Sequence, residues 1–285
     1  MAALLTGCLA APQPDDPSFA PGAPLFEMLP EKYRLGGLVR VGINSMPPLV
    51  YPQGGRMIGV EPDLAAVLGE RLGVSFQFEH AEFADLLPGL EANRFDAVMS
   101  GIHDTRSRRE GTDNDGTRTG AGVDFVRYFK AGTSILIRKG RSGQIAGLSD
   151  LCGRKVVVQK DTTVEETARQ QARACEESDQ RAPTVDPKGS HKDVLDTLAA
   201  GGVDAALMDY PSATHSARLT DSGRTFEVAG PQARPAPYGI AFAKDADKLR
   251  DAVEAALKSV IDSGEYAKIL KKWDVAEGAL TSGDL

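Results

Sequence analysis

Residues that could bind charged groups stand in two places along the sequence. Arg106, Arg108 and Arg109 lie close together in a polar segment, and Asp209 ends an apolar run. The planar fork of an arginine binds a carboxylate through two hydrogen bonds, and a carboxylate binds an ammonium group. The alternatives are solvated loop arginines and a turn-forming aspartate in front of Tyr210. The choice depends on the elements that position these residues.

A repeated stretch predicts where Asp209 lies. Residues 85–90 lead into residues 95–99, and 108 positions later residues 193–198 lead into residues 203–207, with two leucines and an Asp-Ala pair in common. Each copy indicates a short amphipathic helix, a turn and a buried strand. We therefore expect two similar α/β lobes with a ligand cleft between them. Ser100 and Gly101 follow one strand and Asp209 ends the other, at the end of the sheet where ligands bind.

The composition limits the class of protein. The chain has 285 residues, of which 41% are hydrophobic and 26% charged, which is typical of a soluble globular protein. The net charge of -7 argues against a nucleic-acid partner, and no apolar run is long enough for a transmembrane helix. No CxxC motif or His/Cys cluster is present, so we expect no metal and no cofactor. We expect a monomer.

The N-terminal segment predicts a lipid anchor. Leu5–Cys8 has the form of a bacterial lipobox, in which the cysteine is lipidated, although a chance match is the alternative. The segment before it is short for a signal peptide, so we expect residues 1–8 to be the remnant of one. Residues 9–37, which include a tract rich in Pro and Ala, are expected to form a flexible tether. Cys8 would then hold the protein at the outer face of the cell membrane.

Two further cysteines fit that location. If Cys8 carries lipid, Cys152 and Cys175 remain as an even pair. A disulfide between them requires an oxidising compartment. Two unrelated buried thiols are the alternative.

The order of expected elements indicates an α/β fold. Ordered structure should begin near Leu38, and residues 104–122 should form a loop. Strands and helices alternate, which predicts mostly parallel sheets covered by helices. The expected strands are 38–43, 74–78, 134–139, 155–159 and 238–242, and the expected helices begin at Pro62, Val164 and Lys248.

The domain boundaries follow from this order. Residues 38–130 and 239–285 should form lobe 1, and residues 134–233 should form lobe 2. The chain then crosses between the lobes at residues 130–133 and 233–238. Two crossings make a two-segment hinge about which the lobes can close on a ligand.

Several stretches carry a resemblance to a known family through their joint order. They are residues 38–42, 47–48, 59–64, 87–90, 95–98, 105–108, 157–163, 203–205 and 264–273. In this order the sequence resembles the bacterial extracellular solute-binding proteins that supply polar amino acids to ABC importers. The resemblance implies a type II periplasmic-binding-protein fold, an amino acid ligand, an importer permease as partner and no enzymatic activity.

The resemblance also implies which residues hold the two charges of an amino acid. Arg108, in a Thr-x-x-Arg motif with Thr105, would bind the carboxylate, and Asp209 would bind the ammonium group. Thr163 opens a helix whose N-terminus suits the carboxylate, with a plain helix cap as the alternative. His103 stands where a small hydroxyl residue usually helps to hold the carboxylate.

The remaining site residues would surround the ligand. Phe83 matches an aromatic residue that stacks on the ligand side chain, with a plain core residue as the alternative. Ser100 and Gly101 would supply backbone groups. Asn44 and Glu61 match positions that contact a side-chain cation, which favours a polar or cationic ligand, although Glu61 could be only a polar residue before a helix.

The sequence departs from the family at several positions. Asp161 replaces a usual glycine in the loop before Thr163, and residues 44–46 lack the customary aromatic residue. The segment 125–128 also differs from the family pattern. These departures weaken any inference about which amino acid binds. Because the same fold also hosts dehydratases, a dehydratase-like enzyme is kept as an alternative to a binding protein, together with a ligand-sensing receptor.

Overall fold

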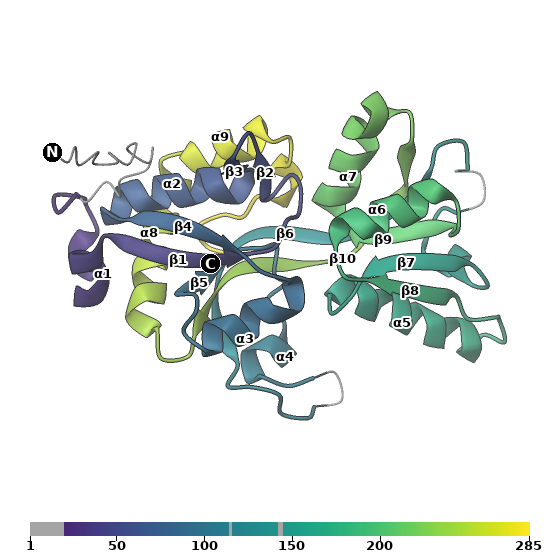
Figure 1. Cartoon of the computed structure of the whole chain (residues 1–285), viewed down its shortest axis with the longest axis horizontal. Coiled ribbons are helices and arrows are strands. Elements are labelled where there is room, and N and C mark those ends of the chain that lie inside the picture. Colours follow the sequence, from purple (N-terminus) through teal and green to yellow (C-terminus); the bar gives the residue numbers. More distant parts are fainter. Residues whose placement is uncertain (1–19, 114–115, 142–144) are drawn as a thin grey trace, which may run out of the picture.

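The computed structural model describes residues 20–113, 116–141 and 145–285. Figure 1 shows two α/β lobes joined by two long strands, β6 (Val123–Arg138) and β10 (Phe226–Ala243). The main sheet has eight strands in the order β4-β1-β5-β10-β6-β9-β7-β8, so that β6 and β10 lie at its centre. The expected two-lobed α/β fold is confirmed.

Lobe 1 contains both ends of the described chain. Its strand β1 (Leu38–Ile43) pairs in parallel with β4 (Ser75–His80) and β5 (Ala97–Val98), and β10 pairs antiparallel with β5. Apolar faces of the helices pack on this sheet and form the larger core of the molecule. The helices of lobe 1 are α1 (Glu31–Gly36), α2 (Val60–Leu72), α3 (Leu86–Glu91), α4 (Arg106–Glu110), α8 (Asp247–Asp262) and α9 (Glu265–Lys272), and a small hairpin joins β2 (Tyr51–Gln53) to β3 (Arg56–Ile58).

Lobe 2 repeats the pattern with its own core. Strand β7 (Lys155–Gln159) pairs in parallel with β8 (Thr184–Lys188) and β9 (Ala205–Asp209), and β6 pairs antiparallel with β9. The covering helices are α5 (Thr163–Glu177), α6 (His191–Ala200) and α7 (Tyr210–Leu219). The repeat is confirmed, because α3 precedes β5 in lobe 1 and α6 precedes β9 in lobe 2.

The two lobes are linked by continuous strands. The segments expected as separate strands at 134–139 and 238–242 are parts of β6 and β10. The pairing of these two strands is irregular where they pass between the lobes, with register shifts between Ala229 and Ala233, between Ala233 and Ala236, and between Tyr238 and Gly239.

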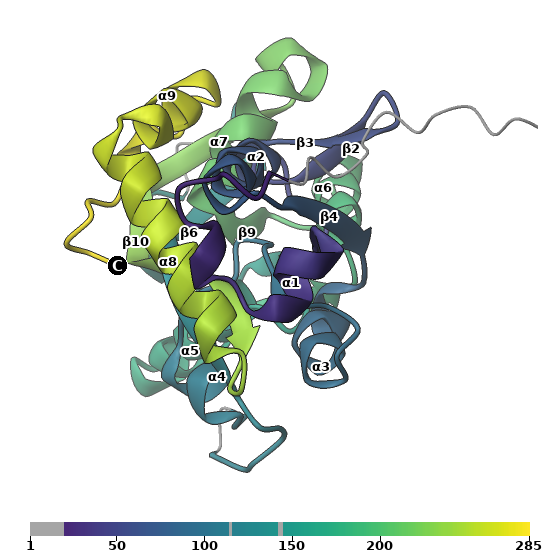
Figure 2. The same cartoon turned by 90° about the vertical axis from the view of Figure 1, so that its left-hand side faces the viewer.

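The prediction that ordered structure begins near Leu38 is wrong. A 3-10 turn at Phe26–Met28 and helix α1 precede it, and Phe26, Leu29 and Tyr33 are buried against lobe 1. The Tyr33 hydroxyl donates to Asp96 Oδ1 over 3.1 Å. Figure 2 looks onto this end of lobe 1, where α1 lies. Apolar side chains in this short segment bury enough surface to order it. The predicted lipidation site, Cys8, lies outside the described residues.

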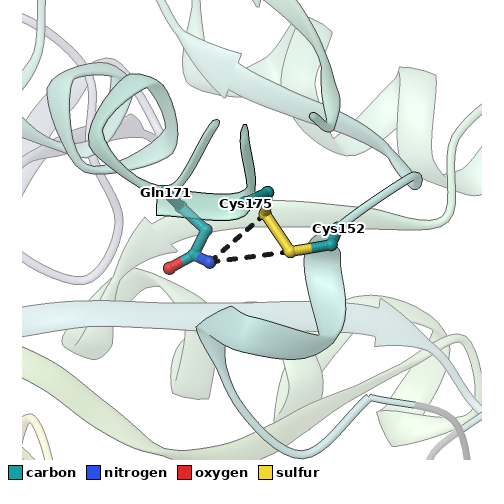
Figure 3. Close-up of a disulfide and its surroundings, with 3 residues drawn as sticks. All are labelled: Cys152, Gln171 and Cys175. Atoms are coloured by element: carbon teal, nitrogen blue, oxygen red, sulfur yellow. Dashed lines mark hydrogen bonds between the residues drawn. A yellow bond between two sulfur atoms is a disulfide. The ribbon is translucent and has the colours of Figure 1, made fainter. Parts of the chain in front are cut away.

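A disulfide joins the start of lobe 2 to its first helix. Cys152 precedes β7, Cys175 lies near the end of α5, and their sulfur atoms are bonded (Figure 3). The Cα atoms are 5.7 Å apart, and Gln171 Nε2 donates to Cys175 Sγ over 3.5 Å. The bond therefore ties the loop before β7 to the helix that follows this strand.

Removing this disulfide should destabilise lobe 2. The closed loop spans 23 positions. A disulfide that closes a loop of that size lowers the conformational entropy of the unfolded chain and so stabilises the folded protein by about 3 kcal/mol. We expect the Cys152→Ser/Cys175→Ser variant to lose about this much unfolding free energy in urea titrations. Gln171→Ala keeps the disulfide and serves as the control. Equal urea midpoints for the double variant and the wild type, or two free thiols in protein secreted to an oxidising compartment, would contradict the prediction.

Candidate binding site between the lobes

A pocket between the lobes brings together eight of the nine residues that the sequence singled out. Lobe 1 contributes the ends of β1 and β5 and the segment that contains α4, and lobe 2 contributes the ends of β7 and β9 and the start of α5. The pocket is lined by Asn44, Met46, Phe83, Ser100, Gly101, His103, Arg108, Gln159, Thr162, Thr163 and Asp209. Glu61 is the predicted site residue that does not line it.

Arg108 enters the pocket from a short helix. The expectation that residues 104–122 form only a loop is wrong, because Thr105 caps helix α4 by accepting a hydrogen bond from the Arg108 N–H. The Arg108 guanidinium lies 5.7 Å from the Phe83 ring centre, and its Nη1 donates to the carbonyl of His103 over 2.9 Å. Burial lowers the pKa of Arg108 to about 10, against the opposing effect of Asp209. The side chain therefore stays a cation at the wall of the pocket.

Asp209 faces the same space from the other lobe. It ends β9, and its side chain does not cap helix α7, so it does not play the simple turn-forming role. Its Oδ1 is buried and finds no hydrogen-bond partner among the described residues. Burial raises the pKa of Asp209, while the nearby His103 opposes this shift. A buried carboxylate with an unfilled hydrogen-bonding position favours a ligand that brings a positive charge.

His103 connects the two lobes across the pocket. Its Nε2 lies 3.2 Å from the carbonyl of Ala131 and its Nδ1 lies 2.9 Å from Thr163 Oγ1. A carbonyl accepts, so Nε2 carries the proton and Nδ1 accepts from the Thr163 hydroxyl. Burial lowers the pKa of His103, which agrees with this neutral form. Both ring nitrogens are therefore occupied, and His103 does not offer the free donor to a carboxylate that the sequence led us to expect.

The start of α5 supplies N–H groups to the pocket. Thr162 caps the helix by accepting a hydrogen bond from the Glu165 N–H over 3.2 Å, so Thr163 is not the cap. Asp161 takes the left-handed conformation with φ of 61°, which an aspartate tolerates better than most residues. Its N–H donates to Glu165 Oε2 over 2.7 Å. The aspartate thus keeps a backbone geometry that suits glycine, and the helix N-terminus remains next to the pocket.

The ends of β1 and β5 are held together beneath the pocket. The Ser100 hydroxyl accepts from the Asn44 N–H over 2.9 Å and donates to the Asn44 carbonyl over 3.0 Å. The Asn44 side chain accepts a hydrogen bond from Gln159 of lobe 2 over 3.2 Å. Gly101 has φ of 57°, a conformation that favours glycine, and a Cβ there would displace the end of the Met46 side chain.

Glu61 supports the pocket from behind and does not contact it. The residue is fully buried in α2, and its Oε1 accepts hydrogen bonds from the Gly101 N–H, over 2.8 Å, and from the Tyr128 hydroxyl. Burial raises the pKa of Glu61 to about 7. The expected contact of Glu61 with a ligand side chain is therefore wrong, because helix α2 directs this carboxylate into lobe 1 at Gly101.

The sequence analysis missed three residues that line the pocket. Gln159 ends β7, which is the same signal that singled out Asp209, so the rule of strand ends could have found it. Thr162 is a helix cap one position before Thr163. Met46 follows Asn44 by two residues and carries no polar group, so the sequence gives no sign of its position in the pocket.

Two lobes with a buried cation from one and a buried anion from the other define a ligand-binding protein of the two-lobed kind. The family model for bacterial extracellular solute-binding proteins, family 3, matches residues 39–276, and the chain belongs to this family. Within the part of the chain that the structure describes, no helix is suited to crossing a membrane. The same residues hold no group of three or more side chains that could bind a metal ion.

Known proteins are similar to this chain over most of its length. The arginine-binding protein ArgT of Corynebacterium glutamicum is 31% identical over 257 residues, which are 89% of this chain and 79% of that protein. A solved ancestral arginine-binding protein bound to arginine is 29% identical, with a TM-score of 0.73 and coverage of 83% of this chain and 98% of its own. The ancestral amino acid-binding protein AncCDT-1, a precursor of cyclohexadienyl dehydratase, is 27% identical, with a TM-score of 0.73 and coverage of 85% and 98%.

Proposed function

We propose that the protein captures a polar or cationic L-amino acid between its lobes and delivers it to an ABC importer. The observation that carries this proposal is the pair of buried opposite charges, Arg108 of lobe 1 and Asp209 of lobe 2, in one pocket. An amino acid is a zwitterion that matches both charges at once. Its carboxylate would lie on Arg108 and the start of α5, and its ammonium group on Asp209.

The electrostatics of the pocket support this assignment. Burial disfavours the charged forms of both Arg108 and Asp209, as the directions of their pKa shifts indicate. A zwitterionic ligand gives each group an opposite charge and hydrogen bonds in place of lost water. Because the two groups belong to different lobes, such a ligand favours the arrangement in which the lobes are closed.

The cell location and partners are part of the proposal. We propose that Cys8 is lipidated, that the lipid holds the protein at the outer face of the membrane, and that the protein docks to permease subunits. The lipobox and the family support this proposal. The disulfide between Cys152 and Cys175 agrees with an oxidising compartment. The relatives that bind arginine support an amino acid as the ligand. We propose that the protein works as a monomer.

A thermal-shift series tests the proposed function. A ligand that binds only the folded protein adds about 2.7 kcal/mol to its stability at a concentration of one hundred times Kd. We expect arginine, lysine, histidine or glutamine to raise the melting temperature, and leucine and glutamate to have little effect. Leucine or glutamate binding at least tenfold more tightly than the others would contradict the ligand class.

A second arm of this experiment separates a binder from an enzyme. The similarity to a dehydratase precursor makes a catalytic activity the alternative. Each amino acid that raises the melting temperature is incubated with the protein and recovered for mass spectrometry. Unchanged ligand supports a binding protein, whereas turnover would replace the proposed function by an enzymatic one. The absence of any thermal shift with folded protein would rule out amino acid capture.

A further inference from the structure

Three residues that line one small cavity next to the pocket each have a buried polar atom without a partner among the described residues. The atoms are Oδ1 of Asp209, Oγ of Ser212 and Nε2 of His191. A buried polar atom without a partner typically costs about 1–3 kcal/mol. Their concentration at one place indicates a cavity that is completed by a polar group from outside the chain.

The cavity lies beyond Asp209, within the face of lobe 2. Ser212 lies in the first turn of α7, and His191 is the first residue of α6. Their exposed fractions are 1% and 8%, so both side chains are shielded from solvent. The rest of the wall is apolar and includes Val164, Val194, Leu207 and Met208.

The cavity adjoins the binding pocket. Both are lined by Met46, Gln159, Thr162 and Asp209. On its other side His191 borders a larger interlobe cleft of about 430 Å³ that also contacts Asn44. An amino acid whose ammonium group lies on Asp209 would therefore have its side chain next to Ser212 and His191.

The charges of the lining decide what kind of side chain fits. Among the described residues that line the pocket and this cavity, Asp209 is the only one with a carboxylate, and the ligand ammonium group uses it. Burial lowers the pKa of His191 to about 4, so its imidazole is neutral at physiological pH. A neutral imidazole, a hydroxyl and the Gln159 amide offer both donors and acceptors. A side-chain cation would find no second anion in this part of the described lining, since Glu82 lines only the larger cleft, and it would lose its hydration.

We propose that Gln159, His191 and Ser212 form a subsite for an uncharged polar side-chain end, so that the ligand is an amino acid with an amide or ureido group. This inference rests on the proposed function, and it narrows the ligand class. An amide donates from its NH₂ group and accepts at its carbonyl oxygen. It therefore suits a wall that holds a hydroxyl and a neutral imidazole.

Binding by calorimetry with L-glutamine, L-citrulline, L-arginine and L-norleucine tests the subsite. The wild type should bind glutamine or citrulline at least tenfold more tightly than arginine. Ser212→Ala should weaken binding of that amide or ureido ligand about tenfold and change norleucine binding by less than threefold. His191→Phe should act in the same direction. Ser212→Ala should not lower the melting temperature of the free protein, because the hydroxyl has no partner there.

Ser134→Ala is the matched control. The Ser134 hydroxyl is also buried without a partner, but Ser134 lines neither the pocket nor this cavity. The variant should bind every ligand as the wild type does.

The outcomes separate the subsite from the proposed function. Arginine binding more tightly than glutamine and citrulline, with no effect of Ser212→Ala, would overturn the subsite and leave amino acid capture intact. An equal loss for norleucine would show a general effect on closure and would also overturn it. Unchanged ligand affinities in both Ser212→Ala and His191→Phe would mean that the cavity holds only an ordered water, which would also overturn the subsite. If no amino acid binds to folded wild-type protein, the proposed function fails together with the subsite.

Discussion

Arg108→Ala is expected to reduce the affinity for the amino acid ligand at least 100-fold while the protein remains folded. The lost interaction is a charge pair shielded from water, and removal of one partner of such a pair costs roughly 2–5 kcal/mol. A 100-fold loss corresponds to about 2.8 kcal/mol. The variant also leaves the ligand carboxylate in a pocket where Asp209 repels it. Isothermal titration calorimetry on the purified variant measures the loss.

The fold should tolerate this substitution because Arg108 contributes little to it. Among the described residues its side chain makes one hydrogen bond, to the His103 carbonyl, and it lies at the pocket wall. Arg106→Ala is the matched control, since Arg106 lies on the same helix, is exposed and pairs only with Glu110 within the described chain. Calorimetry that finds Arg108→Ala within threefold of the wild type, or Arg106→Ala equally impaired, would remove Arg108 from the site.

The fold could be predicted because its signals are local and repeated. The two copies of a helix followed by a buried strand became α3 with β5 and α6 with β9. The rule that ligands bind beyond strand ends placed Ser100, Gly101 and Asp209 at one pocket. These inferences need only the periodicity of apolar residues and the direction of parallel strands.

The remaining errors concern residues whose position depends on tertiary packing. Helix α1 has only six residues, and its order comes from Tyr33, which packs on lobe 1 and bonds to Asp96. Helix α4 has five residues, which is too short for a periodic pattern to show. For Ser212 and His191, the sequence gives no sign that one cavity joins the starts of two helices.

Glu61 shows the same limit in the opposite direction. Its match to a family position and its charge suggested a ligand contact, but helix α2, which contains Glu61, directs the carboxylate into lobe 1. Two donors, the Gly101 N–H and the Tyr128 hydroxyl, both bond to Oε1, whereas Oε2 is buried without a partner. A proton on Oε2 agrees with this arrangement and with the raised pKa.

The titration of Glu61 should make the stability of the protein depend on pH. Burial raises its pKa from the ordinary 4.5 to about 7 in the folded protein. Between these values the folded state holds a proton that the unfolded chain has released, so this contribution is present at low pH and is lost as the pH rises towards 7. Glu61→Gln removes the titration and keeps an oxygen acceptor. The unfolding free energy of the wild type minus that of Glu61→Gln should therefore fall by on the order of 3 kcal/mol between pH 4.5 and pH 7.5.

Urea titrations at half-unit pH intervals measure this difference in unfolding free energy, and two further variants serve as controls. Glu254→Gln changes an exposed glutamate on α8 and should follow the wild-type profile at every pH. Glu61→Ala removes the acceptor as well as the charge and leaves two buried donors without a partner, which costs roughly 2–6 kcal/mol at any pH. A difference between wild type and Glu61→Gln that stays constant within about 0.5 kcal/mol would show that Glu61 does not bind a proton in this range. The Gly101 N–H would then donate to a carboxylate that stays charged over this range. The ligand affinity, like the difference in unfolding free energy, should in that case not change between pH 5 and pH 7.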